Sequence, residues 1–451
     1  MWPNYAFIDA ARRLAKQAER VNRTGLHMAA EFWDMQADFW QHMPLSQVFA
    51  AASANTAQQL RSLASIGQSV YADHTRRPDF NLTETRIDAK DVKVERENLR
   101  QSPFYTLSRF RRDTTRHDPK LLIVAPMSGH YASLLRSTVA ALLPDHDVHI
   151  IDWENIRDVP ASAGKFDFER YMDCVIECLE TMGSDTHVMG ISQSTVPLLA
   201  ATAVLAGQNS PHQPRSMTLI GGPIDTRKTQ TKLHGFVRKT PLSWFKKKVI
   251  DTVPARYKGA GRKVYPGHIQ LASMLHGGQD QHRDNMEVLL NGKLDQCCDK
   301  AELDEFYKDY FAMTDLEAGF FLDTLRHVYQ DHSLASGTMT YRGQKVDLSK
   351  ITKIGLLTVE GDADEICPPD ETTAAHDLCQ NIPASKRKQL LMAGYGHYAI
   401  AMGSKFQKNI APQLSSFIRK IGSLNKKPYS PANQAPPLPH HPNCPSAPKA
   451  R

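Results

Sequence analysis

A short apolar run followed by a serine between small residues occupies positions 186–194, with the sequence THVMGISQS. The run is typical of a buried strand, and the residues after Ser192 are typical of the start of a helix. Gly190 and Ser194 flank Ser192 at two residues on either side. The stretch therefore nearly matches the G-x-S-x-G pattern, in which a sharp strand-turn-helix holds a serine hydroxyl clear of the backbone. Because Ser194 replaces the second glycine, an ordinary strand-to-helix turn is the alternative.

Two later strand candidates are each followed by a residue type that an activated serine needs. The first leads into an acidic turn with Asp362 and Asp364, and the second leads to His397 through a loop with two glycines. Ser, Asp, His is the chain order of α/β-hydrolase enzymes. We predict that Ser192 is the nucleophile, His397 its base and Asp364 the acid that orients the imidazole. Asp362 is the rival acid; Asp364 is preferred because it lies further into the turn, before Ile366, which can pack against the core.

Strands and helices alternate along most of the chain. Apolar runs typical of strands occupy 92–99, 104–111, 120–125, 147–153, 186–191, 217–223, 353–359 and 388–392, and helical patterns follow at 133–143, 168–182 and 406–421. This alternation predicts an α/β protein with a doubly wound, mostly parallel sheet. Catalytic groups gather beyond the carboxyl ends of the strands in such sheets, which is where the three candidates stand.

Three segments depart from the alternation. Residues 1–85 read as a helical arm and linker, and the arm either packs on the rest of the protein or adsorbs to a surface or second copy. Residues 225–345 interrupt the sheet before the acid and the histidine, where a helical cap over the active site would lie. The core is thus divided into 86–224 and 346–424. Residues 425–451 are rich in proline and predict an extended or disordered tail.

The predicted chemistry also needs backbone donors for a tetrahedral oxyanion. The residue after the nucleophile supplies one N–H, here that of Gln193. The second comes from the loop after the third core strand, where Met127 is preferred and Ser128 is the neighbouring option. His130 and Tyr131 follow in the same loop, and either line the substrate path or cap the next helix.

Composition limits the remaining possibilities. The net charge is +7, and twelve Lys and Arg against two Asp give residues 225–263 alone a charge of +10. That segment is either a solvated face or a contact surface for an anionic or polymeric partner. No nucleic-acid motif accompanies it. The seven cysteines are scattered without a C-x-x-C pair, so we expect neither a disulfide framework nor a zinc site. With no signal peptide and no run of about 18 apolar residues, we expect a cytoplasmic protein without a membrane span.

Several motifs resemble those of intracellular polyhydroxyalkanoate depolymerases, a family of the α/β-hydrolase superfamily. They are VAPMSGHY at 124–131, DW at 152–153 with RDVP at 157–160, QSTVP at 193–197, GPIDTR at 222–227, GAGRKVYPG at 259–267, LLTVEG at 356–361 and GHY at 396–398. The resemblance implies hydrolysis of stored poly(3-hydroxybutyrate) at a granule surface without a cofactor or metal, with Ser192, Asp364 and His397 in the triad positions. Members of the family often carry cysteine where this chain has Ser192.

Three other functions remain open from the sequence. A polyhydroxyalkanoate synthase-like acyltransferase would need a thiol in place of Ser192. A catalytically silent coat protein of storage granules would use the helical arm for adsorption. A generic carboxylesterase would cleave small esters and ignore polymer. The oligomeric state is open as well, and a homo-oligomer is possible.

Overall fold

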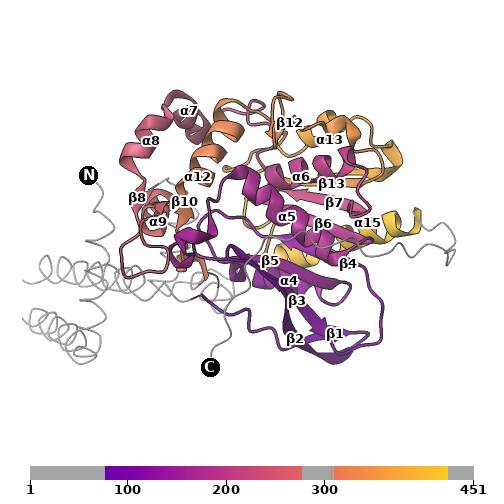
Figure 1. Cartoon of the computed structure of the whole chain (residues 1–451). Helices are drawn as coiled ribbons and strands as arrows, with labels where there is room; N and C mark the ends of the chain where they lie inside the picture. The colour runs from indigo at the N-terminus through magenta and orange to yellow at the C-terminus, as the bar shows by residue number, and fades with distance from the viewer. Residues whose placement is uncertain (1–76, 277–305, 307–308, 425–451) are drawn as a thin grey trace, which may run out of the picture.

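The computed structural model of this chain describes residues 77–276, 306 and 309–424 (Figure 1). The predicted helical arm up to residue 76 and the proline-rich tail lie outside the described residues. No helix of the described part is both long and apolar enough to cross a bilayer.

A nine-stranded sheet forms the centre of the molecule (Figure 1). Its strands are β1 (Glu84–Ile87), β2 (Lys90–Gln101), β3 (Tyr105–Arg112), β4 (Lys120–Val124), β5 (Asp147–Trp153), β6 (Thr186–Ile191), β7 (Ser216–Ile220), β13 (Gly355–Gly361) and β14 (Arg387–Met392). Their order is β1-β2-β3-β5-β4-β6-β7-β13-β14. In this order, β1, β2, β3 and β5 are joined by antiparallel pairings. Every pairing from β5–β4 to β13–β14 is parallel. This order and these directions are those of the α/β-hydrolase fold, which confirms the predicted fold class.

The central strands are buried because helices cover both faces of the sheet. Every residue of β6, β7 and β13 is buried, as their nearly continuous apolar sequences require. The helices are α4 (Arg136–Leu142), α5 (Phe168–Met182), α6 (Thr195–Gly207), α13 (Ala374–Leu378), α14 (Gly403–Lys405) and α15 (Ala411–Leu424). The helix α5 begins at Asp167, whose carboxylate accepts a hydrogen bond from the Arg170 N–H (2.9 Å), and ends before Gly183 at φ +77°.

The N-terminal edge of the sheet differs from the sequence prediction. The arm and linker were predicted to extend to residue 85 and the first strand to begin at residue 92, yet β1 starts at Glu84 and pairs with β2. The prediction was wrong because only Ile87 of this strand is buried, so no apolar alternation marks it. Asp88 and Ala89 form the turn with φ values of +48° and +64°, which residues other than glycine seldom adopt.

The inserted segment is not purely helical. It contains α7 (Lys232–Lys239), α8 (Leu242–Lys248), β8 (Asp251–Thr252), β9 (Lys263–Tyr265), α9 (Gly267–His276), β10 (Leu316–Glu317), α12 (Ala318–Thr324), the π-helical turn η5 (Leu325–Gln330), β11 (Thr340–Tyr341) and β12 (Gln344–Lys345). The strands β10, β9 and β8 form a small antiparallel sheet. Strands of two or three residues carry too few side chains to show a period in the sequence.

Arg262 anchors this cap to the hydrolase core. Its guanidinium donates hydrogen bonds to the carbonyl oxygens of Val159 (2.7 Å) and Pro160 (2.6 Å) and pairs with Glu317 (3.0 Å). Nearby, the N–H of Gly259 donates to the carbonyl of Arg157 (2.8 Å). The GAGRKVYPG and RDVP motifs therefore meet in space, where they hold the cap on the loop that follows β5.

Candidate active site

The turn between β6 and α6 has the geometry of a nucleophile elbow. The strand ends at Ile191, and Ser192 follows with φ +53°, a left-handed conformation that is costly for a side chain with a Cβ and that clusters at active sites. A Cβ at Gly190 would lie 2.8 Å from Cδ2 of Leu198 and 3.3 Å from the Cα of Thr195, both on α6, so any larger residue there would have to displace the helix or the leucine. Strand and helix thus approach closely on either side of the serine.

Ser194, which replaces the second glycine of the motif, stabilises the elbow through its side chain. Its fully buried Oγ accepts a hydrogen bond from the Ile191 N–H (2.8 Å) and donates to the carbonyl oxygen of Val124 (2.8 Å). Val124 is the last residue of β4. The departure from the glycine pattern therefore connects the elbow to the neighbouring strand, whose following loop carries Met127.

We expect Ser194→Ala to lower the free energy of unfolding by about 1–3 kcal/mol, because a buried hydrogen-bonding hydroxyl is lost and its partners stay buried. Urea unfolding measures this change. Ser243→Ala, at an exposed position of α8, serves as the control and should change the free energy by no more than about 0.5 kcal/mol. Equal, small changes at the two positions would show that Ser194 contributes nothing to the elbow.

The three residues predicted as a triad lie within hydrogen-bonding distance of one another. His397 Nε2 is 2.9 Å from Ser192 Oγ, and His397 Nδ1 is 2.7 Å from Asp364 Oδ2. An ionised carboxylate only accepts hydrogen bonds, so Nδ1 carries the proton and Nε2 is left to accept the serine proton. Gly221 lies behind the imidazole: its φ is +52°, and a Cβ there would stand 3.3 Å from His397 Cε1.

The structure pairs the histidine with Asp364 and not with the rival Asp362. The side chain of Asp364 is fully buried, and its Oδ1 accepts backbone hydrogen bonds from Ile366 (2.9 Å) and Cys367 (2.8 Å). Asp362 is exposed, and its carboxylate accepts from the Gly394 N–H (2.6 Å). Two backbone donors fix Asp364 in the orientation that the imidazole requires.

Met127 N–H points toward the elbow. It donates to the side-chain Oε1 of Gln193 (3.1 Å), while Nε2 of the same amide is buried without a hydrogen-bond partner among the described residues. The end of β4 is held by Trp153 Nε1 and the Tyr171 hydroxyl, which donate to the Ala125 carbonyl (2.7 and 3.1 Å). A substrate oxyanion that accepted the Met127 N–H would have to take the place of the Gln193 side-chain oxygen Oε1, which accepts that N–H in this structure. The oxyanion roles of Met127 and Gln193 stay predictions.

His130 and Tyr131 lie in different surroundings. The ring of His130 packs at a tilt against Tyr310 of the inserted segment, with centroids 4.7 Å apart. Tyr310 in turn contacts Tyr398, the neighbour of the triad histidine (5.9 Å). Tyr131 is buried, and its hydroxyl accepts a hydrogen bond from the Asn155 amide (3.3 Å). The aromatic group formed by His130, Tyr310 and Tyr398 therefore lies beside the triad, whereas Tyr131 is held by Asn155 within the core.

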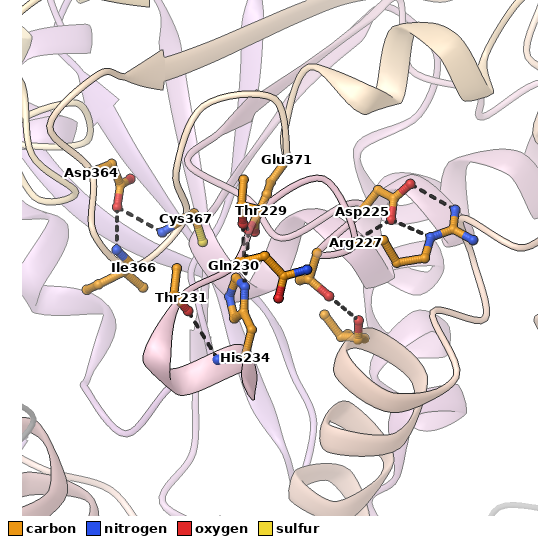
Figure 2. A network of polar contacts seen from close by, with 12 residues as sticks. Asp225, Arg227, Thr229, Gln230, Thr231, His234, Asp364, Ile366, Cys367 and Glu371 are labelled. Atoms are coloured by element: carbon orange, nitrogen blue, oxygen red, sulfur yellow. Dashed lines mark hydrogen bonds and ion pairs between the residues drawn. The ribbon is translucent and has the colours of Figure 1, made fainter. Parts of the chain in front are cut away.

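A buried Glu371–His234 pair connects the cap to the loop of the acid, and the sequence analysis missed it (Figure 2). Glu371 and His234 are fully buried, with Oε1 3.4 Å from Nδ1, and the Thr229 hydroxyl also donates to Glu371. Burial raises the pKa of Glu371 to about 8, and burial lowers the pKa of His234 to about 4. Both side chains are therefore mainly neutral at pH 7. The contact joins α7 to the segment that follows Asp364.

Because of this pair, we expect the free energy of unfolding to fall as the pH rises from 6.5 to about 8. Between its ordinary pKa of 4.5 and about 8, folded Glu371 keeps a proton that the unfolded chain releases, so the free energy of unfolding falls as pH rises. His234 has the opposite effect between about 4 and 6.5, because only the unfolded chain binds its proton there. Above pH 6.5 only Glu371 of the two residues still has this effect. The free energy of unfolding should then fall by up to about 1.4 kcal/mol per pH unit as far as pH 8.

Urea unfolding of Glu371→Gln at pH 6.5 and pH 8 tests this expectation. The variant should lose less stability than the wild type between the two pH values, because the amide does not titrate. Glu365→Gln, an exposed change in the same loop, should follow the wild type. The assignment is wrong if Glu371→Gln and the wild type lose the same amount.

Neither a reactive thiol nor a metal site accompanies the triad in the described residues. Burial holds the pKa of the Cys367 thiol, next to the acid loop, well above its ordinary value, so the thiol stays protonated. Among the described ranges, no group of three or more His, Cys, Asp or Glu side chains could hold a metal ion.

Part of this chain matches a known protein family. The family described as "PHB de-polymerase C-terminus" matches residues 221–422, from the glycine behind the imidazole through the acid and histidine to α15. Residues 221–422 are therefore similar to the C-terminal part of this family. The matched region contains Asp364 and His397, while Ser192 lies before it in the hydrolase core. With its elbow and triad geometry, the protein is an esterase-type α/β-hydrolase.

Other similarities are more distant. The chain is 24% identical over 312 residues to the poly(3-hydroxyalkanoate) polymerase subunit PhaC of Allochromatium vinosum, covering 67% of this chain and 81% of that protein. Among solved structures, it is similar to a putative aryl esterase from Burkholderia cenocepacia (15% identity, TM-score 0.41, 73% of this chain and 100% of that one) and a bromoperoxidase from Bacillus anthracis (13%, 0.44, 72% and 100%). The fold assignment rests on the sheet topology described above.

Proposed function

We propose that this protein is a polyhydroxyalkanoate depolymerase that hydrolyses ester bonds of stored poly(3-hydroxybutyrate) to oligomers or 3-hydroxybutyrate. The observation that carries the proposal is the Ser192–His397–Asp364 chain of hydrogen bonds, two of whose members lie in the region that matches the depolymerase family. The proposed partner is the polymer at a granule surface in the cytoplasm.

The geometry supports an acyl-enzyme mechanism. Ser192 Oγ attacks the ester carbonyl while His397 Nε2 takes its proton, and Asp364 stabilises the imidazolium that forms. The tetrahedral oxyanion is bound by the N–H groups of Met127 and Gln193 after the Gln193 side-chain oxygen has moved away. His397 then gives its proton to the departing chain alcohol. A water molecule, activated by the same base, releases the acyl group from Ser192.

A polyhydroxyalkanoate synthase-like acyltransferase is the second candidate, favoured by the similarity to the Allochromatium vinosum polymerase subunit. A synthase must hold the growing acyl chain on its nucleophile and transfer it to the next monomer before water hydrolyses the acyl-enzyme. A thiol suits this role, whereas Ser192 forms an oxygen ester that water resolves. The serine therefore favours hydrolysis.

Three soluble substrates separate the candidates. We expect the protein to hydrolyse a linear trimer of 3-hydroxybutyrate and a p-nitrophenyl butyrate ester, and not to release coenzyme A from 3-hydroxybutyryl-coenzyme A. Release of coenzyme A with growth of a polymer would support the synthase. Cleavage of the p-nitrophenyl ester alone would indicate a generic carboxylesterase, and no turnover of any substrate would indicate a coat protein.

A further inference from the structure

The outer surface of the cap presents apolar side chains to solvent at the helices α7 and α8, which stand at the periphery of the molecule in Figure 1. The exposed fractions of Leu233, Phe236 and Trp244 are 49%, 47% and 39%. The other large exposed apolar side chains of the described residues are Leu99 and Leu391, on the separate strands β2 and β14. The cap is therefore where exposed apolar surface gathers.

These side chains rest on a rigid base. The rings of Phe236 and Trp244 lie edge to face with centroids 5.7 Å apart, and each also contacts Phe245 (5.8 and 5.2 Å). Phe245 is buried in a second apolar cluster with Val237, Val249, Ile269 and Leu325. The exposed rings are thus held by a packed core, and a partner would lose little side-chain entropy in ordering them.

Lysines lie on the same two helices as the exposed rings, and this segment contains no acid. Residues 226–250 contain eight Lys and Arg and no Asp or Glu. Three of the eight have partners within the fold: Arg227 pairs with Asp225, Lys228 with Asp377, and Arg238 donates to backbone carbonyls. The other five are exposed and have no ion-pair partner among the described residues; they are Lys232, Lys239, Lys246, Lys247 and Lys248. We call these five lysines with Leu233, Phe236 and Trp244 the α7–α8 surface.

We propose that the α7–α8 surface binds a layer of anionic lipid, with Leu233, Phe236 and Trp244 entering the boundary between headgroups and acyl chains and the lysines pairing with headgroup phosphates. Aromatic rings with an adjoining basic rim are the combination that such boundaries bind. A neutral polyester alone would leave the five positive charges without counterparts. A second copy of the chain would place lysines against lysines, and like charges in contact oppose association. The inference goes beyond the proposed function, because it concerns binding and not the ester that Ser192 cleaves.

Sedimentation of the full chain with vesicles tests the proposal. We expect binding to phosphatidylglycerol vesicles, much weaker binding to phosphatidylcholine vesicles, and a decline with added salt. Each lysine at an anionic surface is worth roughly 1 kcal/mol, or about fivefold in affinity, so Lys246→Glu/Lys247→Glu/Lys248→Glu should bind phosphatidylglycerol at least about a hundredfold more weakly. Phe236→Ser/Trp244→Ser should weaken it at least about tenfold.

Matched control variants distinguish an effect of the α7–α8 surface from an effect of the protein's net charge or of exposed apolar side chains elsewhere. Lys353→Glu/Lys408→Glu/Lys420→Glu changes the charge by the same amount at exposed positions outside the cap, and Leu99→Ser/Leu391→Ser removes exposed apolar side chains elsewhere. Both controls should bind as the wild type does. Ser192→Ala should also bind normally, and the cap variants should keep p-nitrophenyl butyrate turnover, so failure of the catalytic proposal and failure of this one are distinguishable.

Three outcomes would overturn the proposal. Equal binding to phosphatidylglycerol and phosphatidylcholine vesicles would show that the lysines do not contribute to binding. Equal binding by the cap variants and the wild type would place the lipid contact elsewhere in the chain. A dimer in sedimentation equilibrium that Phe236→Ser/Trp244→Ser dissociates would make a second copy the occupant.

Discussion

Ser192→Ala is expected to lower kcat for p-nitrophenyl butyrate about 10⁵- to 10⁶-fold, because the proposed mechanism has no covalent intermediate without the hydroxyl. The hydroxyl lies 2.9 Å from His397 Nε2, so no second nucleophile is required to explain turnover. Alanine fits the elbow, since its Cβ meets the same left-handed backbone as that of serine. We therefore expect the folded structure, followed by circular dichroism and urea unfolding, to change little.

Ser192→Cys serves as the companion variant. A thiol at this position can also be deprotonated by His397, and the resemblance to depolymerases implies that cysteine is competent there. We expect this variant to retain far more activity than Ser192→Ala. Residual turnover above about 1% in Ser192→Ala would contradict the assignment of the nucleophile.

Asp364→Asn is expected to lower kcat about 10⁴-fold, while Asp362→Asn, two residues away, should stay within a few-fold of the wild type. The amide oxygen of asparagine can still accept from the Ile366 and Cys367 N–H groups, which places its NH₂ group toward His397. The NH₂ group cannot accept a hydrogen bond from Nδ1–H of His397. The imidazole therefore takes the tautomer with the proton on Nε2, which cannot accept the proton of Ser192.

Steady-state kinetics with p-nitrophenyl butyrate measure the two variants side by side. Asp362 is exposed and serves as the matched control, because the substitution removes the same charge from the same loop. A larger loss at Asp362 than at Asp364, or similar losses at the two, would contradict the assignment of the acid.

The sequence was sufficient for the inner strands of the central sheet, because they are apolar and separated by helical patterns. The β4 to β7 strands lie where the apolar runs predicted them, and the order Ser, Asp, His follows from that framework. The strand β1 was missed because only Ile87 of its residues is buried, and the cap sheet because its strands are too short to show a period.

Side-chain roles that depend on distant contacts could not be read from the sequence. Ser194 looked like an imperfect motif, but its hydroxyl bonds to Val124 on a different strand. The pair formed by Glu371 and His234 has no local signal, because the two residues meet only when the cap folds onto the acid loop. Likewise, the sequence of the basic segment does not distinguish Arg262, which the structure shows anchoring the cap, from the lysines that are exposed on α8.

The central claim is that Ser192 cleaves a stored polyester, and the most direct test is release of 3-hydroxybutyrate or its oligomers from native amorphous poly(3-hydroxybutyrate) granules. The account predicts release by the wild type and none above background by Ser192→Ala, with similar amounts of the two proteins bound to the granules. Release that persists in Ser192→Ala would contradict the nucleophile, and bound wild type without release would contradict the depolymerase.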